Sequence, residues 1–296
     1  MSQTQKHKLV VSISAPKSGT TALFHCLARC ADIAVPKIKE PCYFAPKNGP
    51  NHSGLPRRLH LNGRHHLGAK WFDGLYNNPA PLRLDFSTFY SATPNTPQLL
   101  YRHDPDARLV MVLRDPVKRF VSHYYHYRKM GLRLPPIETV ISTDNALRRY
   151  LLRFADYELT YFRFSDWFPL DQISLLKFED MIAAPKHAEL EMQSFLGLSD
   201  FKFKPKSKER NSAGRPRSVW MQNLLLGHHM GGLSALAPIS PKPLLKLRRK
   251  IVSLNTAPAR NPTLLKKDED HLRDLLAAQY DFIDHLFPKK ELAHAA

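Results

Sequence analysis

Hydrophobic residues along this chain gather in short runs of strand length that alternate with segments of helical spacing. An apolar run predicts a buried strand over residues 8–14, and apolar positions at helical spacing predict a helix over residues 21–31. A turn containing Pro16 and Gly19 separates them. The same reading predicts strands over 81–86, 108–113 and 172–177, a helix from Pro116, and another helix ending near Gly197.

Strands that alternate with helices predict an α/β fold with a mostly parallel central sheet flanked by helices on both faces. The expected organisation is a single domain over residues 1–296, with a helical C-terminal part over 227–296. Within that part, residues 242–250 suggest a basic amphipathic helix and residues 268–286 a terminal helix. Residues 202–217 are expected to form a basic loop, and 45–69 a long surface loop. Sites in such sheets lie beyond the carboxyl ends of the strands.

Charge narrows the classes of partner. The 44 Lys and Arg residues outnumber the 26 Asp and Glu residues, for a formal net charge of +18. Such a field favours anionic partners, namely nucleotides, acidic glycans, nucleic acid or an anionic membrane. The 3 cysteines argue against a disulfide framework, and no metal site is expected. The polar start and the lack of a stretch of ~20 apolar residues predict no signal peptide, no membrane span and a cytoplasmic location.

A phosphate-binding element is indicated by Ser14-Ala15-Pro16-Lys17-Ser18-Gly19-Thr20-Thr21, between the first strand and the first helix. A helix N-terminus offers free backbone N–H groups and positive dipole charge. Gly19 permits close approach, Lys17 adds a charge, and the threonines add hydroxyl donors. An ordinary strand-to-helix turn is the alternative, but the combination of Lys, Gly and Thr favours phosphate. An ATPase loop has a different order, because here the lysine precedes the glycine by two residues.

A second anion-binding element follows the strand over 108–113. The strand leads into Arg114, Pro116 opens a helix, and Ser122 comes eight residues after the arginine. Arginine offers a planar fork of donors and serine a short donor, which together suit a phosphate. For this motif alone, a helix start with incidental charge is an equal alternative.

In this order the two elements resemble the 5′-phosphosulfate loop and the 3′-phosphate segment of the sulfotransferase superfamily. Residues 36–44, Pro-Lys-Ile-Lys-Glu-Pro-Cys-Tyr-Phe, are similar to the Lys-Glu-Pro-x-x-Phe element of bacterial and heparan-type carbohydrate sulfotransferases, with Cys42 where a His is common. Residues 70–73 and 85–90 resemble two further family elements more loosely. The resemblance covers roughly residues 8–226.

This resemblance implies a P-loop-like domain that moves a sulfuryl group from 3′-phosphoadenosine 5′-phosphosulfate (PAPS) to a hydroxyl or amine acceptor, with a carbohydrate or other anionic acceptor favoured. It implies that Lys17 stabilises the leaving phosphate, that Glu40 is the general base and that Lys39 assists. Residues 210–218 resemble a donor-covering loop of bacterial members. The implied donor-binding residues are Pro16, Lys17, Ser18, Gly19, Thr20, Thr21, Arg114, Ser122, Arg210, Gly214, Arg215 and Arg217.

Three alternatives stay open at this stage. His123, His65 and His66 compete with Glu40 for the role of base, because histidine titrates near neutral pH. A P-loop kinase or nucleotidase would use Asp115 to hold magnesium. The charge also suggests a nucleic-acid-binding protein, but the tyrosines among the basic residues fall inside the phosphate-segment helix, so no nucleic-acid partner is expected. The oligomeric state is not indicated.

Overall fold

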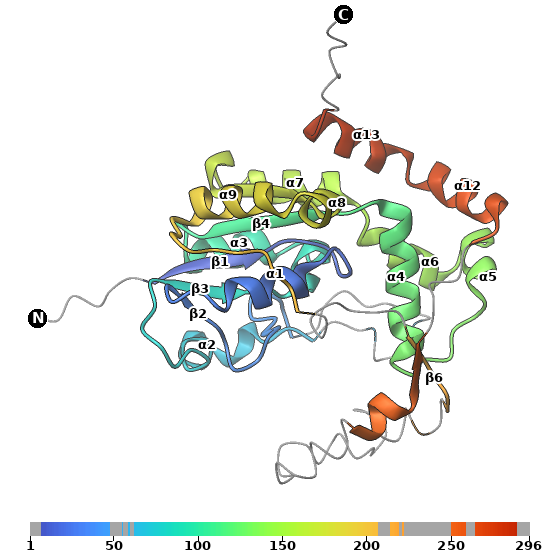
Figure 1. Cartoon of the computed structure of the whole chain (residues 1–296), viewed down its shortest axis with the longest axis horizontal. Helices are drawn as coiled ribbons and strands as arrows, with labels where there is room; N and C mark the ends of the chain where they lie inside the picture. The colour runs from blue at the N-terminus through green and yellow to red at the C-terminus, as the bar shows by residue number, and fades with distance from the viewer. Residues whose placement is uncertain are drawn as a thin grey trace, which may run out of the picture.

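A five-stranded parallel sheet forms the centre of the molecule in the computed structural model (Figure 1). The structure describes residues 7–47, 55, 59, 62–206, 214–218, 221, 250–258 and 264–288. The strand order is β2-β3-β1-β4-β5. The strands are β1 (Lys8–Ser12), β2 (Ile33–Ala34), β3 (Leu82–Asp85), β4 (Arg108–Leu113) and β5 (Ile173–Lys177). The predicted parallel sheet is therefore confirmed.

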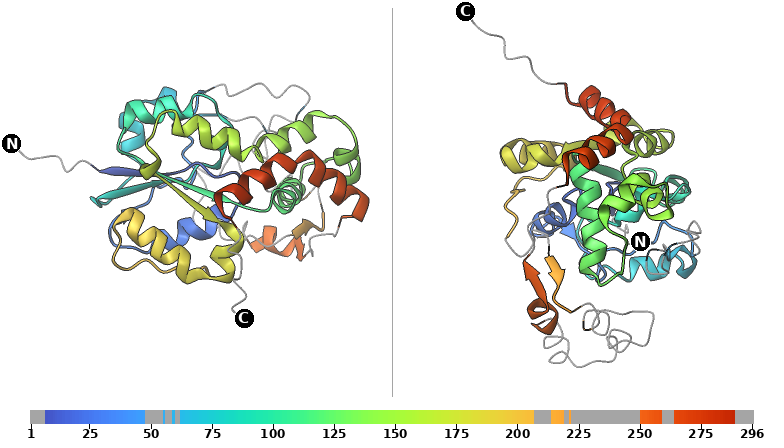
Figure 2. Two further views of the ribbon diagram at one scale, coloured as in Figure 1. Left: turned by 90° about the horizontal axis from the view of Figure 1, so that it is seen from above. Right: turned by 90° about the vertical axis from the view of Figure 1, so that its right-hand side faces the viewer.

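Helices cover both faces of this sheet (Figure 2). One face packs on α1 (Thr20–Leu27), α8 (Phe178–Ala183) and α9 (Pro185–Leu196) through the side chains of Val10, Leu84 and Val110. The alternate side chains Leu9, Val11 and Leu109 pack on the opposite face. Because successive side chains of a strand point to opposite faces, strands buried on both sides are apolar throughout. The helices of the second face are α2 (Ala69–Asp73), α3 (Thr96–His103), α4 (Pro116–Lys129), α5 (Ile137–Ser142), α6 (Ala146–Arg153), α7 (Tyr157–Ser165), α12 (Lys266–Leu275) and α13 (Ala277–Leu286).

Local capping explains where the helices of the two motifs begin. The α1 helix follows Gly19, whose φ of 93° lies in the left-handed region that glycine adopts readily. The α4 helix begins with Pro116 at its first position, and the Asp115 side chain accepts a hydrogen bond from the Lys118 backbone N–H at 2.8 Å. The carboxylate that a kinase would need for magnesium therefore caps a helix.

Several predicted boundaries differ from those observed. The predicted helix over 21–31 ends at Leu27, and the single helix predicted over 268–286 is two helices that meet at Leu276. The predicted loop over 202–217 contains a strand, β6 (Gly214–Pro216), which pairs antiparallel with β7 (Thr256–Pro258), so the C-terminal part is not purely helical. The basic helix predicted over 242–250 lies almost wholly outside the described residues.

The two-stranded antiparallel sheet of β6 and β7 stands apart from the main sheet and packs against α4 through β6 (Figure 1). The buried Asn255, directly before β7, is hydrogen-bonded to Ser218, shortly after β6. The Ser218 backbone N–H donates to Asn255 Oδ1 at 2.9 Å, and Asn255 Nδ2 donates to the Ser218 carbonyl at 2.9 Å. The loops that follow β1, β3 and β4 all lie at the carboxyl edge of the sheet, since these strands are parallel. In the described part of the chain, no helix has the length and apolar character needed to cross a bilayer.

Candidate active site

The loop after β1 is tied directly to the end of β4. Lys17 has a φ of 74°, unusual for a residue with a side chain, and Arg114 Nη1 donates to the Lys17 carbonyl at 2.7 Å. The Arg114 guanidinium lies 4.7 Å from the centre of the Phe178 ring. A Cβ atom on Gly19 would come within 2.4 Å of the same ring, so this position requires glycine. The two predicted phosphate motifs thus form one structural unit.

Lys17 is surrounded by like charges. Burial, followed by the charges of Arg114, Lys129 and Lys39, lowers its pKa to about 8, whereas the Glu40 carboxylate acts in the opposite direction. The charged form of Lys17 is strongly stabilised when an anion binds beside it, because the negative charge offsets the repulsion among the cations. The arrangement is suited to binding a strongly anionic group.

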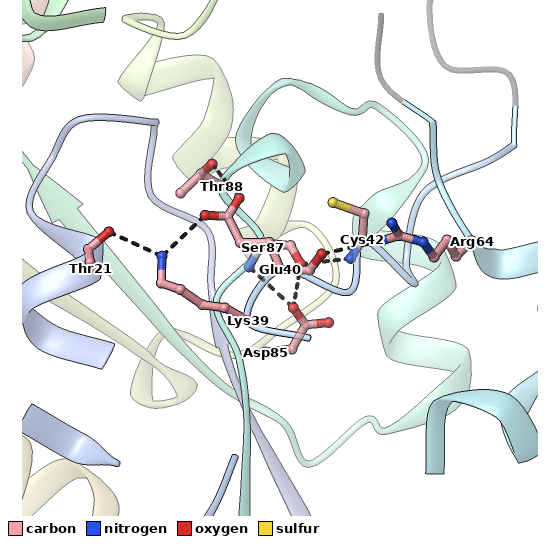
Figure 3. A network of polar contacts seen from close by, with 8 residues as sticks. All are labelled: Thr21, Lys39, Glu40, Cys42, Arg64, Asp85, Ser87 and Thr88. Atoms are coloured by element: carbon pink, nitrogen blue, oxygen red, sulfur yellow. Dashed lines mark hydrogen bonds and ion pairs between the residues drawn. The ribbon is translucent and has the colours of Figure 1, made fainter. Parts of the chain in front are cut away.

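Lys39 and Glu40 extend the site from the loop after β2. Lys39 Nζ donates to Thr21 Oγ1 at 3.1 Å and to Glu40 Oε1 at 3.2 Å, and Thr88 Oγ1 donates to Glu40 Oε2 at 3.2 Å (Figure 3). Both Lys39 and Glu40 are half-buried. Lys39 therefore links the first helix of the phosphate loop to the carboxylate predicted to be the base.

The backbone around Glu40 is held by residues to which the sequence assigned no role. Arg64 Nη1 donates to the Pro41 carbonyl at 2.6 Å and to the Glu40 carbonyl at 3.3 Å. On the other side, Ser87 Oγ accepts the Cys42 backbone N–H at 2.9 Å (Figure 3). Residues 85–90 had been singled out only as a loose family element. Nothing in the local sequence of Arg64 or Ser87 indicates these contacts, which span 24 and 45 residues respectively.

One face of α4 also turns toward the site. Ser122, His126 and Lys129 are spaced four and three residues apart, which places them on the same side of the helix. Burial, together with the charges of Lys17, Lys129 and Lys39, lowers the pKa of His126 to about 3, so this ring is near the cationic cluster and neutral at pH 7. Sequence analysis missed His126 and Lys129, although their spacing from Ser122 was a usable signal.

His123 does not fit the role of base. It is 1% exposed, and its Nδ1 accepts a hydrogen bond from the fully buried Arg119 at 3.1 Å. Arginine can only donate, so Nδ1 carries the lone pair and Nε2 carries the proton, which is directed to Tyr127 Oη at 3.0 Å. Both ring nitrogens are engaged inside the core. Burial and the Arg119 charge hold the pKa of His123 well below its usual range.

The other two histidines lie on the loop before α2. The His65 ring packs against Tyr43 with ring centres 5.0 Å apart, and His66 is exposed. The nucleic-acid alternative would use Tyr124, Tyr125 and Tyr127 as stacking platforms, but Tyr124 and Tyr127 are buried in the core and Tyr125 is half-buried. These positions leave Glu40 as the candidate base with the most direct connection to Lys17, Lys39 and Thr21.

The predicted donor-covering loop is described in part. Gly214 and Arg215 belong to β6, which packs against α4, the helix that carries Ser122. Arg217 is exposed, and its backbone N–H donates to the Asn255 carbonyl at 2.6 Å. Arg210 lies outside the described residues. Across the described ranges, no cluster of three or more His, Cys, Asp or Glu side chains is arranged to hold a metal ion.

Comparison with known proteins identifies the family of this chain. A family model for the sulfotransferase domain matches residues 7–212. The chain is 25% identical over 177 residues to the mouse protein heparan sulfate glucosamine 3-O-sulfotransferase 6, an alignment that covers 51% of this chain and 49% of the relative. The chain thus spans about half the length of that curated relative.

A solved structure shares the fold. The crystal structure of a sulfotransferase from Alicyclobacillus acidocaldarius superimposes with a TM-score of 0.59 at 19% identity, covering 93% of this chain and 99% of that one. At this identity the likeness concerns the fold, and the family model carries the assignment because it spans most of the chain. This chain belongs to the sulfotransferase domain family.

Proposed function

We propose that this sulfotransferase takes its sulfuryl group from PAPS and transfers it to a hydroxyl or amine of a carbohydrate. The observation that carries the proposal is the junction of Lys17, Arg114 and the Lys39–Glu40 pair at one edge of the sheet. Cationic side chains and a carboxylate lie side by side there, which supports a transfer from an anionic donor to a protic acceptor.

Features of Arg114 support the donor assignment. Its Nε is buried and has no hydrogen-bond partner among the described residues, while Nη1 is used to hold Lys17. Buried donors are normally satisfied, so an unsatisfied guanidinium N–H suits an incoming oxyanion. In the proposal Arg114 and Ser122 bind the 3′-phosphate, whereas Lys17, Ser18, Gly19, Thr20 and Thr21 bind the 5′-phosphosulfate. Pro16, which is buried, shapes this loop. The proposal also assigns Gly214, Arg215, Arg217 and Arg210 to donor binding, of which Arg210 lies outside the described residues.

The proposed reaction is an in-line displacement at sulfur. The acceptor oxygen or nitrogen forms a bond to sulfur as the bond from sulfur to the phosphate oxygen breaks, and Glu40 takes the acceptor proton. Lys17 stabilises the negative charge that develops on the leaving phosphate. Lys39 orients the Glu40 carboxylate through its 3.2 Å contact. The products are the sulfated acceptor and 3′-phosphoadenosine 5′-phosphate (PAP). Positioning and charge stabilisation supply most of the catalysis in such transfers.

The acceptor class is proposed from two observations. The mouse relative is named for the 3-O-sulfation of glucosamine in heparan sulfate, an anionic glycan. This chain carries a net charge of +18, and Lys129 and Lys39 both act on the site. Together these support a carbohydrate acceptor that already bears negative charge.

Donor recognition is tested by calorimetry with PAP and AMP, which differ by the 3′-phosphate. Charge-assisted hydrogen bonds contribute ~1.5–3 kcal/mol each, so PAP should bind at least ~10-fold more tightly than AMP. Arg114→Ala should remove most of this preference, but it also releases the Lys17 carbonyl. Ser122→Ala is therefore the matched variant, since it should weaken PAP and leave AMP unchanged. Equal affinities for PAP and AMP in the wild-type protein would overturn the assignment.

A further inference from the structure

Asp85 is a fully buried carboxylate at the carboxyl end of β3, beside the Glu40 loop. Its Oδ1 accepts hydrogen bonds from Ser87 Oγ at 2.6 Å and from the Ser87 backbone N–H at 3.2 Å, and its Oδ2 accepts one from Tyr90 Oη at 2.7 Å. Burying a carboxylate is costly unless it is well hydrogen-bonded. Burial raises its pKa to about 6 despite these bonds. A carboxylate buried at such a cost in free energy suggests that Asp85 has a function beyond packing.

The hydroxyl groups of Ser87 and Tyr90 connect Asp85 to the backbone of the loop over residues 40–44. Ser87 Oγ accepts the Cys42 backbone N–H at 2.9 Å, and Tyr90 Oη accepts the Phe44 backbone N–H at 3.1 Å. A hydroxyl has one proton to donate, and an ionised carboxylate can only accept. Asp85 therefore accepts hydrogen bonds from both hydroxyls. This leaves the oxygen lone pairs of Ser87 and Tyr90 free to accept hydrogen bonds from the backbone of the Glu40 loop.

The loop has a conformation that needs such support. Cys42 has a φ of 51°, in the left-handed region that residues with a side chain seldom adopt. Arg64 holds the same stretch from the other side through the Glu40 and Pro41 carbonyls. Thr88, which directly follows Ser87, donates to the Glu40 carboxylate itself (Figure 3). Residues 85–90 thus touch both the backbone of the loop and its functional side chain.

We propose that Asp85 is a positioning residue for Glu40: through the Ser87 and Tyr90 hydroxyls it fixes the backbone of residues 40–44, so that the Glu40 carboxylate is held between Lys39 and Thr88. The inference rests on the proposed role of Glu40 as general base. It follows that Asp85 acts on the rate of transfer and not on donor affinity, because the side chains it binds, Ser87 and Tyr90, hold the backbone of Cys42 and Phe44 in the Glu40 loop.

The test is a double-mutant cycle of Asp85→Asn and Glu40→Gln, with kcat, KM and the Kd for PAP measured for each protein. In Asp85→Asn the amide N–H₂ can no longer accept the Tyr90 proton, so the loop loses one support. Misplacing a reacting group by ~1 Å can cost about 100-fold in rate. We expect kcat to fall ~10- to 100-fold with the Kd for PAP unchanged. In the Glu40→Gln background the same substitution should cost less than ~3-fold.

A matched control is Asp104→Asn, because Asp104 is also a buried carboxylate, but it binds the Leu9 backbone N–H at the opposite end of β1. It should lower the melting temperature and leave kcat within ~2-fold of wild type. Should Asp85→Asn fail to fold, Ser87→Ala and Tyr90→Phe each remove one of the two hydroxyl links. Each should lower kcat only when Glu40 is present.

The outcomes separate the two proposals. If Asp85→Asn lowered kcat by the same factor in the wild-type protein and in the Glu40→Gln variant, the positioning role of Asp85 would be overturned. The proposed role of Glu40 as general base would then still stand. Wild-type kcat in Glu40→Gln would overturn both the base and the positioning role. The donor proposal would survive that result if PAP still bound more tightly than AMP.

Discussion

Lys17 is the residue whose charge state most directly limits the rate of the proposed reaction. Burial and neighbouring cations lower its pKa to about 8, from an ordinary value of 10.5. A lysine with a lowered pKa is protonated below that value and loses its charge as the pH rises through it. We therefore expect kcat/KM for the donor, which reports the free enzyme, to fall above pH about 8. At donor saturation, kcat should fall at a higher pH, because bound negative charge favours the ammonium form.

Lys17→Arg provides the control for this pH dependence. A guanidinium stays protonated throughout the measurable range, so the decline in kcat/KM near pH 8 should disappear even if the rate is lower. An unchanged alkaline decline in Lys17→Arg would assign it to another group.

Residue identity was predictable from sequence for part of the site. Lys17, Gly19, Lys39, Glu40 and Arg114 stand in motifs with a known order, and the structure brings them together. Their roles in catalysis stay predictions. The engagement of His123 by Arg119 could not be predicted, because it depends on which face of α4 is buried.

At the scale of elements, the turn from β1 into α1 depends on Gly19. Its φ of 93° and the Phe178 ring both oppose a side chain there. Left-handed backbone costs a residue with a Cβ about 1–2 kcal/mol, and the ring contact adds to this cost. Gly19→Ala should therefore lower the free energy of unfolding by more than ~2 kcal/mol and weaken PAP binding at least ~10-fold. Thermal denaturation and calorimetry measure the two effects.

Gly197→Ala is the comparison that isolates the contribution of φ. Gly197 ends α9 with a φ of 69°, and a Cβ there would meet nothing within 4 Å. It should lose ~1 kcal/mol of stability and keep its affinity for PAP. If Gly19→Ala bound PAP as tightly as Gly197→Ala, the turn would not be part of the donor site.

Elements with strong local signals were predicted better than the rest. The strands over 108–113 and 172–177 were expected within one residue of the observed β4 and β5, because unbroken apolar runs mark buried parallel strands. The helices α2, α3, α5, α6 and α7 and the short strand β2 were not predicted. Short elements of this kind form where neighbouring segments bury one of their faces, and their own sequence carries little signal.

For the whole molecule, the net charge of +18 should influence acceptor binding more than turnover. Salt screens charges beyond ~8 Å at physiological ionic strength. With donor saturating, the KM for a sulfated oligosaccharide should rise several-fold between ~50 and ~300 mM salt, while kcat changes little. A desulfated oligosaccharide of the same length is the control. Equal salt dependence for both acceptors would contradict an anionic acceptor.

The sequence by itself determined the fold class and the meeting of the two phosphate motifs. Parallel strands place all their carboxyl ends at one edge, so motifs that follow strands must converge there. Only the tertiary structure decided how the loop that carries the Glu40 carboxylate is held in place. The contacts of Ser87 with Cys42 and of Tyr90 with Phe44 join segments more than 40 residues apart, and their strength comes from burial in the assembled core. Burial depends on which segments pack together, and no local pattern of residues specifies that.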